Sequence, residues 1–118
     1  MFYQDIPYVN SVQQDIALAK QGVEMILSQN DQIDSFGVIV WKNRVLVGII
    51  PHPLYSRTQR DALETAIKSD ISDVYGFEET LVSFDMDILY EINKLNRSGD
   101  IKDETAQKLF NSVRVRRK

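Results

Sequence analysis

The alternation of apolar and polar positions between Asp34 and Ile50 predicts two β-strands joined by a two-residue turn at Lys42-Asn43. Side chains alternate along a strand, so cross-strand partners share one face of the hairpin. The pairs predicted on one face are Val40 with Val45, Val38 with Val47 and Phe36 with Ile49. The other face is also largely apolar, and carries Gly37, Ile39, Trp41, Leu46, Gly48 and Ile50. An isolated hairpin cannot bury two apolar faces, so further strands and helices must pack on it.

A helix is predicted before the hairpin, because apolar residues from Val12 recur at spacings of three and four. The positions concerned are Val12, Ile16, Ala19, Val23 and Ile26. Either Asn10 or Ser11 can cap its start, and the turn-forming residues 28–32 end it. The stripe is one-sided, so this helix should lie across one face of the sheet.

A second helix is predicted after Pro51 and Pro53 break the second strand. Residues 56–59 form a capping-box pattern, and Thr58 offers another cap. The helix should run to about Asp70, with its buried side made by Leu63, Ala66, Ile67 and Ile71. Residues 72–77 are predicted to form a loop, and residues 79–85 alternate as a third strand does.

Two more helices complete the predicted order. The first begins at a cap on Asp85 or Asp87 and stops at Ser98-Gly99, and the second is capped by Asp103. Their apolar positions are Ile88, Leu89, Ile92 and Leu95, then Ala106, Leu109, Phe110 and Val113. The order α-β-β-α-β with two C-terminal helices predicts an α+β fold, a small mixed three-stranded sheet covered by helices. We expect a lead-in at 1–11, one domain over 12–114 and a basic tail at 115–118.

Composition limits the functional classes. A chain of 118 residues forms one domain with a substantial core. It has no cysteine, which excludes disulfides, thiol chemistry and cysteine-based metal sites. No apolar run approaches the roughly 20 residues that span a bilayer, and the N-terminus shows no signal-peptide pattern. The net charge is −3, which argues against a broad nucleic-acid-binding surface.

Few residues are candidates for chemistry. His52 stands between two prolines without a neighbouring nucleophile, which indicates a loop residue. Four aspartates could offer oxygen ligands to a cation, namely Asp70, Asp73, Asp85 and Asp87. They lack the spacing and the glycine of a calcium-binding loop. Glu78 and Glu79 are adjacent in an extended segment, so we expect them to point apart into solvent. The sequence therefore predicts no catalytic residue, no cofactor and no metal ligand.

Possible partner contacts are predicted at two places. Trp41 at the hairpin tip is either a half-exposed contact anchor or a core residue packed against a helix. The basic end of the chain is either a binding element or a frayed, solvated terminus, and comprises Arg114, Arg116, Arg117 and Lys118.

Several segments resemble the YhcN/YlaJ family of sporulation lipoproteins. Residues 46–49, Leu-Val-Gly-Ile, match the second hairpin strand of that family, and residues 83–87, Ser-Phe-Asp-Met-Asp, occupy its Ala-Asp-Pro-Asp position. The following helix and the turn at residues 98–101 match as well. Met86 stands where the family has proline, and the lipobox cysteine of the family is missing.

The resemblance implies a non-enzymatic protein of the spore envelope or inner spore membrane region that acts in sporulation or germination. Its implied partners are proteins of the spore envelope or cortex-lytic machinery, with membrane association only through a lipidated precursor or a partner. The element order also resembles BON domains and ring-building modules, and this alternative implies self-assembly into a homo-oligomer without a spore-specific role.

Overall fold

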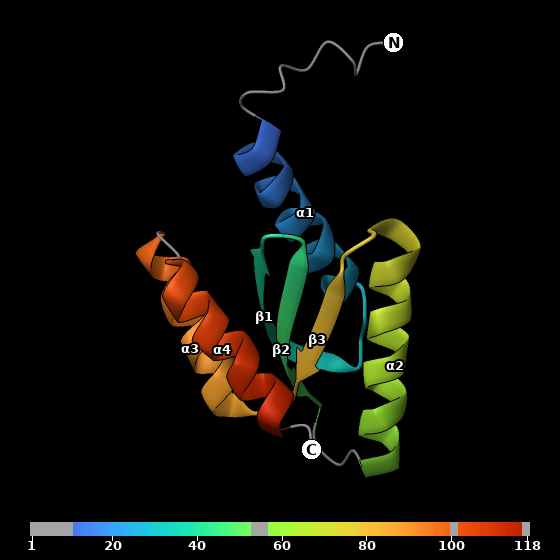
Figure 1. Ribbon diagram of the computed structural model, residues 1–118. Coiled ribbons are helices and arrows are strands. Elements are labelled where there is room, and N and C mark those ends of the chain that lie inside the picture. The colour runs from blue at the N-terminus through green and yellow to red at the C-terminus, as the bar shows by residue number, and fades with distance from the viewer. Residues whose placement is uncertain (1–10, 53–56, 100–101, 117–118) are drawn as a thin grey trace, which may run out of the picture.

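The computed structural model describes residues 11–52, 57–99 and 102–116, with side chains described for 16–52, 57–99 and 102–115. The elements follow the predicted order, so the α+β class is confirmed (Figure 1). They are α1 (Ser11–Ser28), β1 (Ile33–Trp41), β2 (Arg44–Pro51), α2 (Arg57–Val74), β3 (Glu79–Ser83), α3 (Met86–Ser98) and α4 (Asp103–Arg116).

The sheet has the strand order β1-β2-β3, with β1 and β2 antiparallel and β2 and β3 parallel. All three predicted hairpin pairs are present: Val40 with Val45, Val38 with Val47, and Phe36 with Ile49. The turn residue with positive φ is Lys42, at 57°, although asparagine adopts this conformation more readily. β3 runs parallel to β2 because the intervening α2 returns the chain to the end of the sheet where β2 began.

The fold has three layers, with the sheet between two pairs of helices (Figure 1). On one face, α1 and α2 pack on a core that contains Val23, Leu27, Val38, Val47, Ile49, Leu63, Ile67, Ile71 and Val82. On the other face, α3 and α4 pack on Ile39, Trp41, Leu46, Leu81, Ile88, Ile92, Leu109, Phe110 and Val113. Each hairpin strand contributes alternate residues to the two cores, which explains why both of its faces are apolar.

A pair of glycines brings α3 close to the sheet. Gly37 and Gly48 are cross-strand partners. A Cβ on Gly48 would lie 3.1 Å from the Cα of Leu89, and one on Gly37 would lie 2.9 Å from Cγ2 of Ile92. The missing side chains therefore let the backbone of α3 approach the strands.

The start of α3 decides between the predicted caps Asp85 and Asp87, whereas Asn10 and Ser56 lie outside the described residues. Asp85 is the N-cap of α3, since its side chain accepts a 2.8 Å hydrogen bond from the N–H of Asp87. Gly99, with φ of 75°, ends α3 and donates its N–H to the carbonyl of Leu95. Lys102 precedes α4, and its carbonyl accepts from the N–H of Ala106 at 3.0 Å. The predicted cap at Asp103 is thus wrong by one residue, because Asp103 is the first residue of α4.

Two element boundaries also differ from the sequence-based prediction. α2 continues to Val74 rather than ending near Asp70, because Ile71 is fully buried and repeats the spacing of Ile67. β3 ends at Ser83, two residues earlier than predicted, where the chain turns into the cap of α3. Among the described residues, no helix is long and apolar enough to cross a membrane.

Candidate functional site

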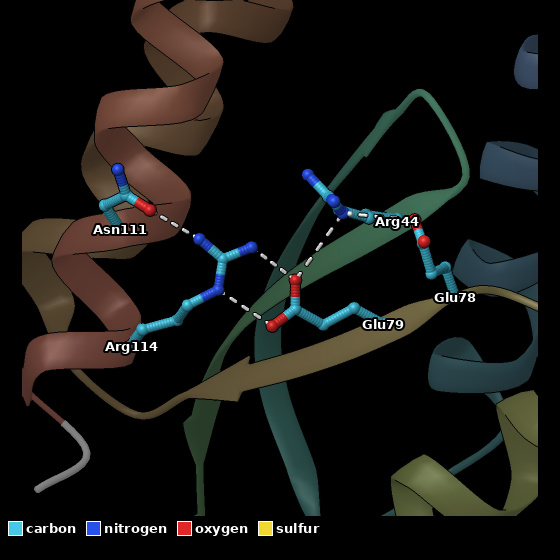
Figure 2. Close-up of polar contacts among 5 residues, drawn as sticks. All are labelled: Arg44, Glu78, Glu79, Asn111 and Arg114. Carbon is cyan, nitrogen blue, oxygen red and sulfur yellow. Dashed lines mark hydrogen bonds and ion pairs between the residues drawn. The ribbon is translucent and has the colours of Figure 1, made fainter.

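Four charged side chains and one asparagine meet beside the hairpin turn and form the ion-pair cluster (Figure 2). They come from β2, from β3 and the residue before it, and from α4. The cluster consists of Arg44, Glu78, Glu79, Asn111 and Arg114. Arg44 begins β2 and Glu79 begins β3, and the two are direct partners in the parallel register. Arg114 reaches them from the last turn of α4. The sheet register therefore brings residues from distant parts of the sequence together.

Arg114 holds Glu79 through two hydrogen bonds. Its Nε donates to Oε2 at 2.8 Å, and its Nη2 donates to Oε1 (Figure 2). The guanidinium also donates to Oδ1 of Asn111 one turn earlier in α4. The hydrogen bonds and positive charge of Arg114 lower the pKa of Glu79, with a smaller contribution from the charge of Arg44. Glu79 in turn raises the pKa of Arg114. This bidentate pair fastens α4 to β3.

Arg44 contacts both glutamates, with Nε 3.4 Å from Oε1 of Glu78 and 3.8 Å from Oε1 of Glu79. Glu78 is exposed, as predicted, but the prediction that the adjacent glutamates point apart is wrong, because both carboxylates lie near Arg44. Glu78 precedes the strand, and its N–H bonds the carbonyl of Asn43 at 2.7 Å, which turns it toward β2. Two arginines and two carboxylates neutralise one another here, so the cluster serves as a clamp between elements.

Trp41 is a core residue, with 8% of its surface exposed. Its ring lies 5.6 Å from that of Phe110, and its Nε1 donates to Oδ1 of Asp103 at 2.8 Å. The Nζ of Lys42 lies 4.8 Å from the ring centroid. The prediction that Trp41 is a half-exposed contact anchor is thus wrong, and the alternative prediction, that it packs in the core against a helix, is confirmed. Its burial and its hydrogen bond both depend on α4, whose approach a local pattern does not reveal.

The other predicted site residues do not gather at one place. Arg114 pairs with Glu79 from within α4, so it is not part of a frayed terminus. Arg116 is the last residue of α4, and its side chain lies outside the described ones. Arg117 and Lys118 lie outside the described residues. His52 is exposed, and its N–H bonds the carbonyl of Gln32 at 3.1 Å. Within the described part of the chain, no three acidic or histidine side chains are placed to hold a metal ion.

An apolar groove of about 390 Å³ lies on the other side of the hairpin tip. We call it the α1 groove, and its lining residues are Ile16, Leu18, Ala19, Val40, Lys42, Asn43, Tyr75, Gly76 and Phe77. The rings of Tyr75 and Phe77 pack at 5.5 Å in the connection between α2 and β3. Gly22 makes room for Tyr75, because a Cβ there would lie 1.6 Å from the tyrosine oxygen.

The α1 groove opens to solvent. Leu18, Lys42 and Gly76 on its border are exposed, and 62% of the Leu18 surface is accessible. Sequence reasoning missed this feature because it treated residues 72–77 as a simple loop. The available signal was the aromatic pair Tyr75 and Phe77 within a short connection, together with the apolar stripe of α1.

A second concavity, of about 470 Å³, lies where β3 ends. Its lining carries charges of both signs from the first turns of α2, including Arg57, Arg60 and Asp61. The guanidinium of Arg60 lies 5.8 Å from the ring of Phe84. Because charged side chains of both signs line it, this concavity is less apolar than the α1 groove.

Comparisons with protein-family models, with curated proteins and with solved structures found no match for this chain. The resemblance to the YhcN/YlaJ family therefore stays a prediction.

Proposed function

We propose that this chain is a non-enzymatic binding module of the spore envelope that acts in sporulation or germination, and that it binds a protein partner through the α1 groove. The observation that carries the binding role is the groove itself, an apolar concavity open to solvent. The spore context rests on the resemblance of residues 46–49 and 83–87 to the YhcN/YlaJ family.

The groove has the composition of a protein-binding site. Apolar and aromatic side chains make most of its wall, and Lys42 and Asn43 add polar groups on the hairpin side. Concavities of this kind gain binding free energy by removing apolar surface from water, while a few polar groups orient the ligand. Leu18 presents a large apolar surface directly beside it, as residues at partner contacts do.

The experiment compares fluorescent fusions at the C-terminus in the source cell, carrying wild-type, Ala19→Glu or Ala17→Glu sequence. Ala19 lines the groove, whereas Ala17 is exposed on α1 and does not line it. We expect wild type and Ala17→Glu to concentrate at the developing forespore or its envelope, and Ala19→Glu to spread through the cell.

Circular dichroism of the purified variants checks that each is folded. Leu18→Ala provides a milder second variant, because it removes exposed apolar surface without adding charge. A uniform vegetative cytoplasmic signal from the wild-type fusion would contradict the spore role, and correct localisation of folded Ala19→Glu would contradict the role of the groove.

A further inference from the structure

The apolar stripe of α1 extends beyond the sheet that it covers. Val23 and Leu27, in the second half of the helix, are 0% and 1% exposed. Ile16 and Ala19, on the same stripe, are only half-buried and line the groove. Figure 1 shows why, since the first part of α1 projects past the hairpin turn. This end of the helix therefore has apolar surface that the described residues leave partly uncovered.

The charge of the groove indicates what would cover it. Lys42 is its one charged lining residue among those described, and its side chain is exposed. The Nζ of Lys42 lies 4.8 Å from the ring centroid of Trp41, which belongs to the opposite face of the hairpin. An apolar segment that carries a single carboxylate would match the wall of the groove, and would pair with Lys42 once that side chain turns away from Trp41.

We propose that residues 1–10 of the same chain dock in the α1 groove. This segment is MFYQDIPYVN, with Phe2, Tyr3 and Ile6 as apolar groups and Asp5 as its only charged side chain. Its composition suits the groove, with Asp5 as the carboxylate that would pair with Lys42. It also joins the chain directly before α1, the helix that forms one wall of the groove.

The length of the segment allows this docking. Ser11 and Ala19 are separated by about 12 Å along the helix axis, at 1.5 Å per residue. Ten extended residues reach about 33 Å, so the chain can reverse direction and still run along the groove. Pro7 disfavours the helical conformation at Ile6, the residue before it. Extension of α1 toward the N-terminus past Pro7 is therefore unfavourable.

Docking of residues 1–10 would regulate the proposed binding site, because the segment and the partner would occupy the same groove. This inference therefore rests on the proposed function. A tethered segment meets its site at an effective concentration in the millimolar range. A partner must therefore displace residues 1–10 before it binds, and deletion of the segment should strengthen partner binding.

The test compares two-dimensional amide NMR spectra of the full chain and of a chain lacking residues 2–10. We expect shifted signals at Lys42, Asn43 and Gly76, three residues that line the groove. A synthetic peptide of residues 1–10 should restore the full-chain positions in the truncated chain, with a Kd of about 1 mM or tighter, as a millimolar effective concentration requires.

Variants separate docking from general destabilisation. In the full chain, Phe2→Ala with Tyr3→Ala should reproduce the spectrum of the truncated chain at the groove signals, whereas Gln4→Ala should leave them unchanged. In the truncated chain, Ala19→Glu should abolish the response to the peptide, and Ala17→Glu should preserve it.

Unchanged groove signals on truncation, or a peptide Kd above about 10 mM, would overturn the proposal. Shifts that appear only at high protein concentration would also overturn it, because they indicate docking on a second copy. If the NMR test fails but the Ala19→Glu fusion still loses its localisation, the docking of residues 1–10 is wrong and the proposed function stands. The two proposals can therefore be tested independently.

Discussion

The two faces of the sheet are covered by helix pairs that are held in different ways. α4 is tied to the sheet by directional contacts, namely the Trp41–Asp103 hydrogen bond and the Arg114–Glu79 ion pair. α3 adds a 3.0 Å hydrogen bond from the side chain of Asn96 to the carbonyl of Val38. On the opposite face, the ion pairs Lys20–Glu24 and Glu64–Lys68, among the residues that the structure describes, each join two side chains of one helix.

This difference separates a face whose helices make directional contacts with the strands from a face where aliphatic packing predominates in the described contacts. Hydrogen bonds and ion pairs specify distance and direction, so α3 and α4 have one register on the strands. Aliphatic packing is less directional. On this face, α1, the hairpin tip and the connection between α2 and β3 leave a groove between them. The face with aliphatic packing is the one that carries the proposed binding site.

The largest expected effect tests the two cores. Phe110→Ala should lower the free energy of unfolding by about 3–5 kcal/mol, because the ring is fully buried and its loss leaves a cavity. It should also shift the Trp41 emission to longer wavelength, since Phe110 packs on that indole. Ile67→Ala, in the other core, should cost about 2–5 kcal/mol and leave the emission of the folded state unchanged. Denaturant unfolding followed by fluorescence checks both, and an unshifted Phe110→Ala spectrum would refute this separation of the faces.

An intermediate effect is expected from a glycine on each face. Gly48→Ala should cost about 1–3 kcal/mol, because its methyl group meets the backbone of α3 at Leu89. Gly22→Ala should change stability by less than about 1 kcal/mol, since alanine favours the helix and the Tyr75 ring can rotate toward the groove. Thermal unfolding measures both. Equal losses for the two variants would show that the α1 face is as rigid as the other.

The smallest effect concerns the ion-pair cluster. Glu79→Gln should lower the free energy of unfolding at pH 7 by about 1 kcal/mol, and Glu78→Gln by less, since Glu78 is more exposed and more distant from Arg44 than Glu79 is from Arg114.

The pH dependence of this effect has a defined sign. Arg114 lowers the pKa of Glu79 below its ordinary value of 4.5, so the stabilisation is full above that pH and is lost as the pH falls through the folded-state pKa. The difference between wild type and Glu79→Gln should therefore shrink below about pH 4.5. A difference that is constant from pH 7 to pH 3 would contradict the pairing.

Local patterns predicted the elements well because their causes are local. Alternation predicted the hairpin register, and the apolar stripes predicted the helices and most of their buried residues. Ala66 is an exception, because it is exposed on α2. The end of α2 was misplaced because Asp70, Ser72 and Asp73 are turn-forming types, whereas the burial of Ile71 favours continued helix. The site contacts could not be predicted in this way. Glu79 and Arg114 are 35 residues apart, and Trp41 and Asp103 are 62 apart, so only the tertiary packing brings them together.

The parallel pairing of β3 has a consequence for the order of folding. The hairpin closes through a two-residue turn, whereas β3 reaches β2 only after a connection that contains all of α2. Contacts between residues far apart in the sequence form slowly, so the β2–β3 pairing should follow the hairpin. Because α4 is clamped to β3, α4 should dock after the hairpin and the β2–β3 pairing have formed. Trp41 is the single tryptophan, and its quenching or blue shift during refolding would time this last step.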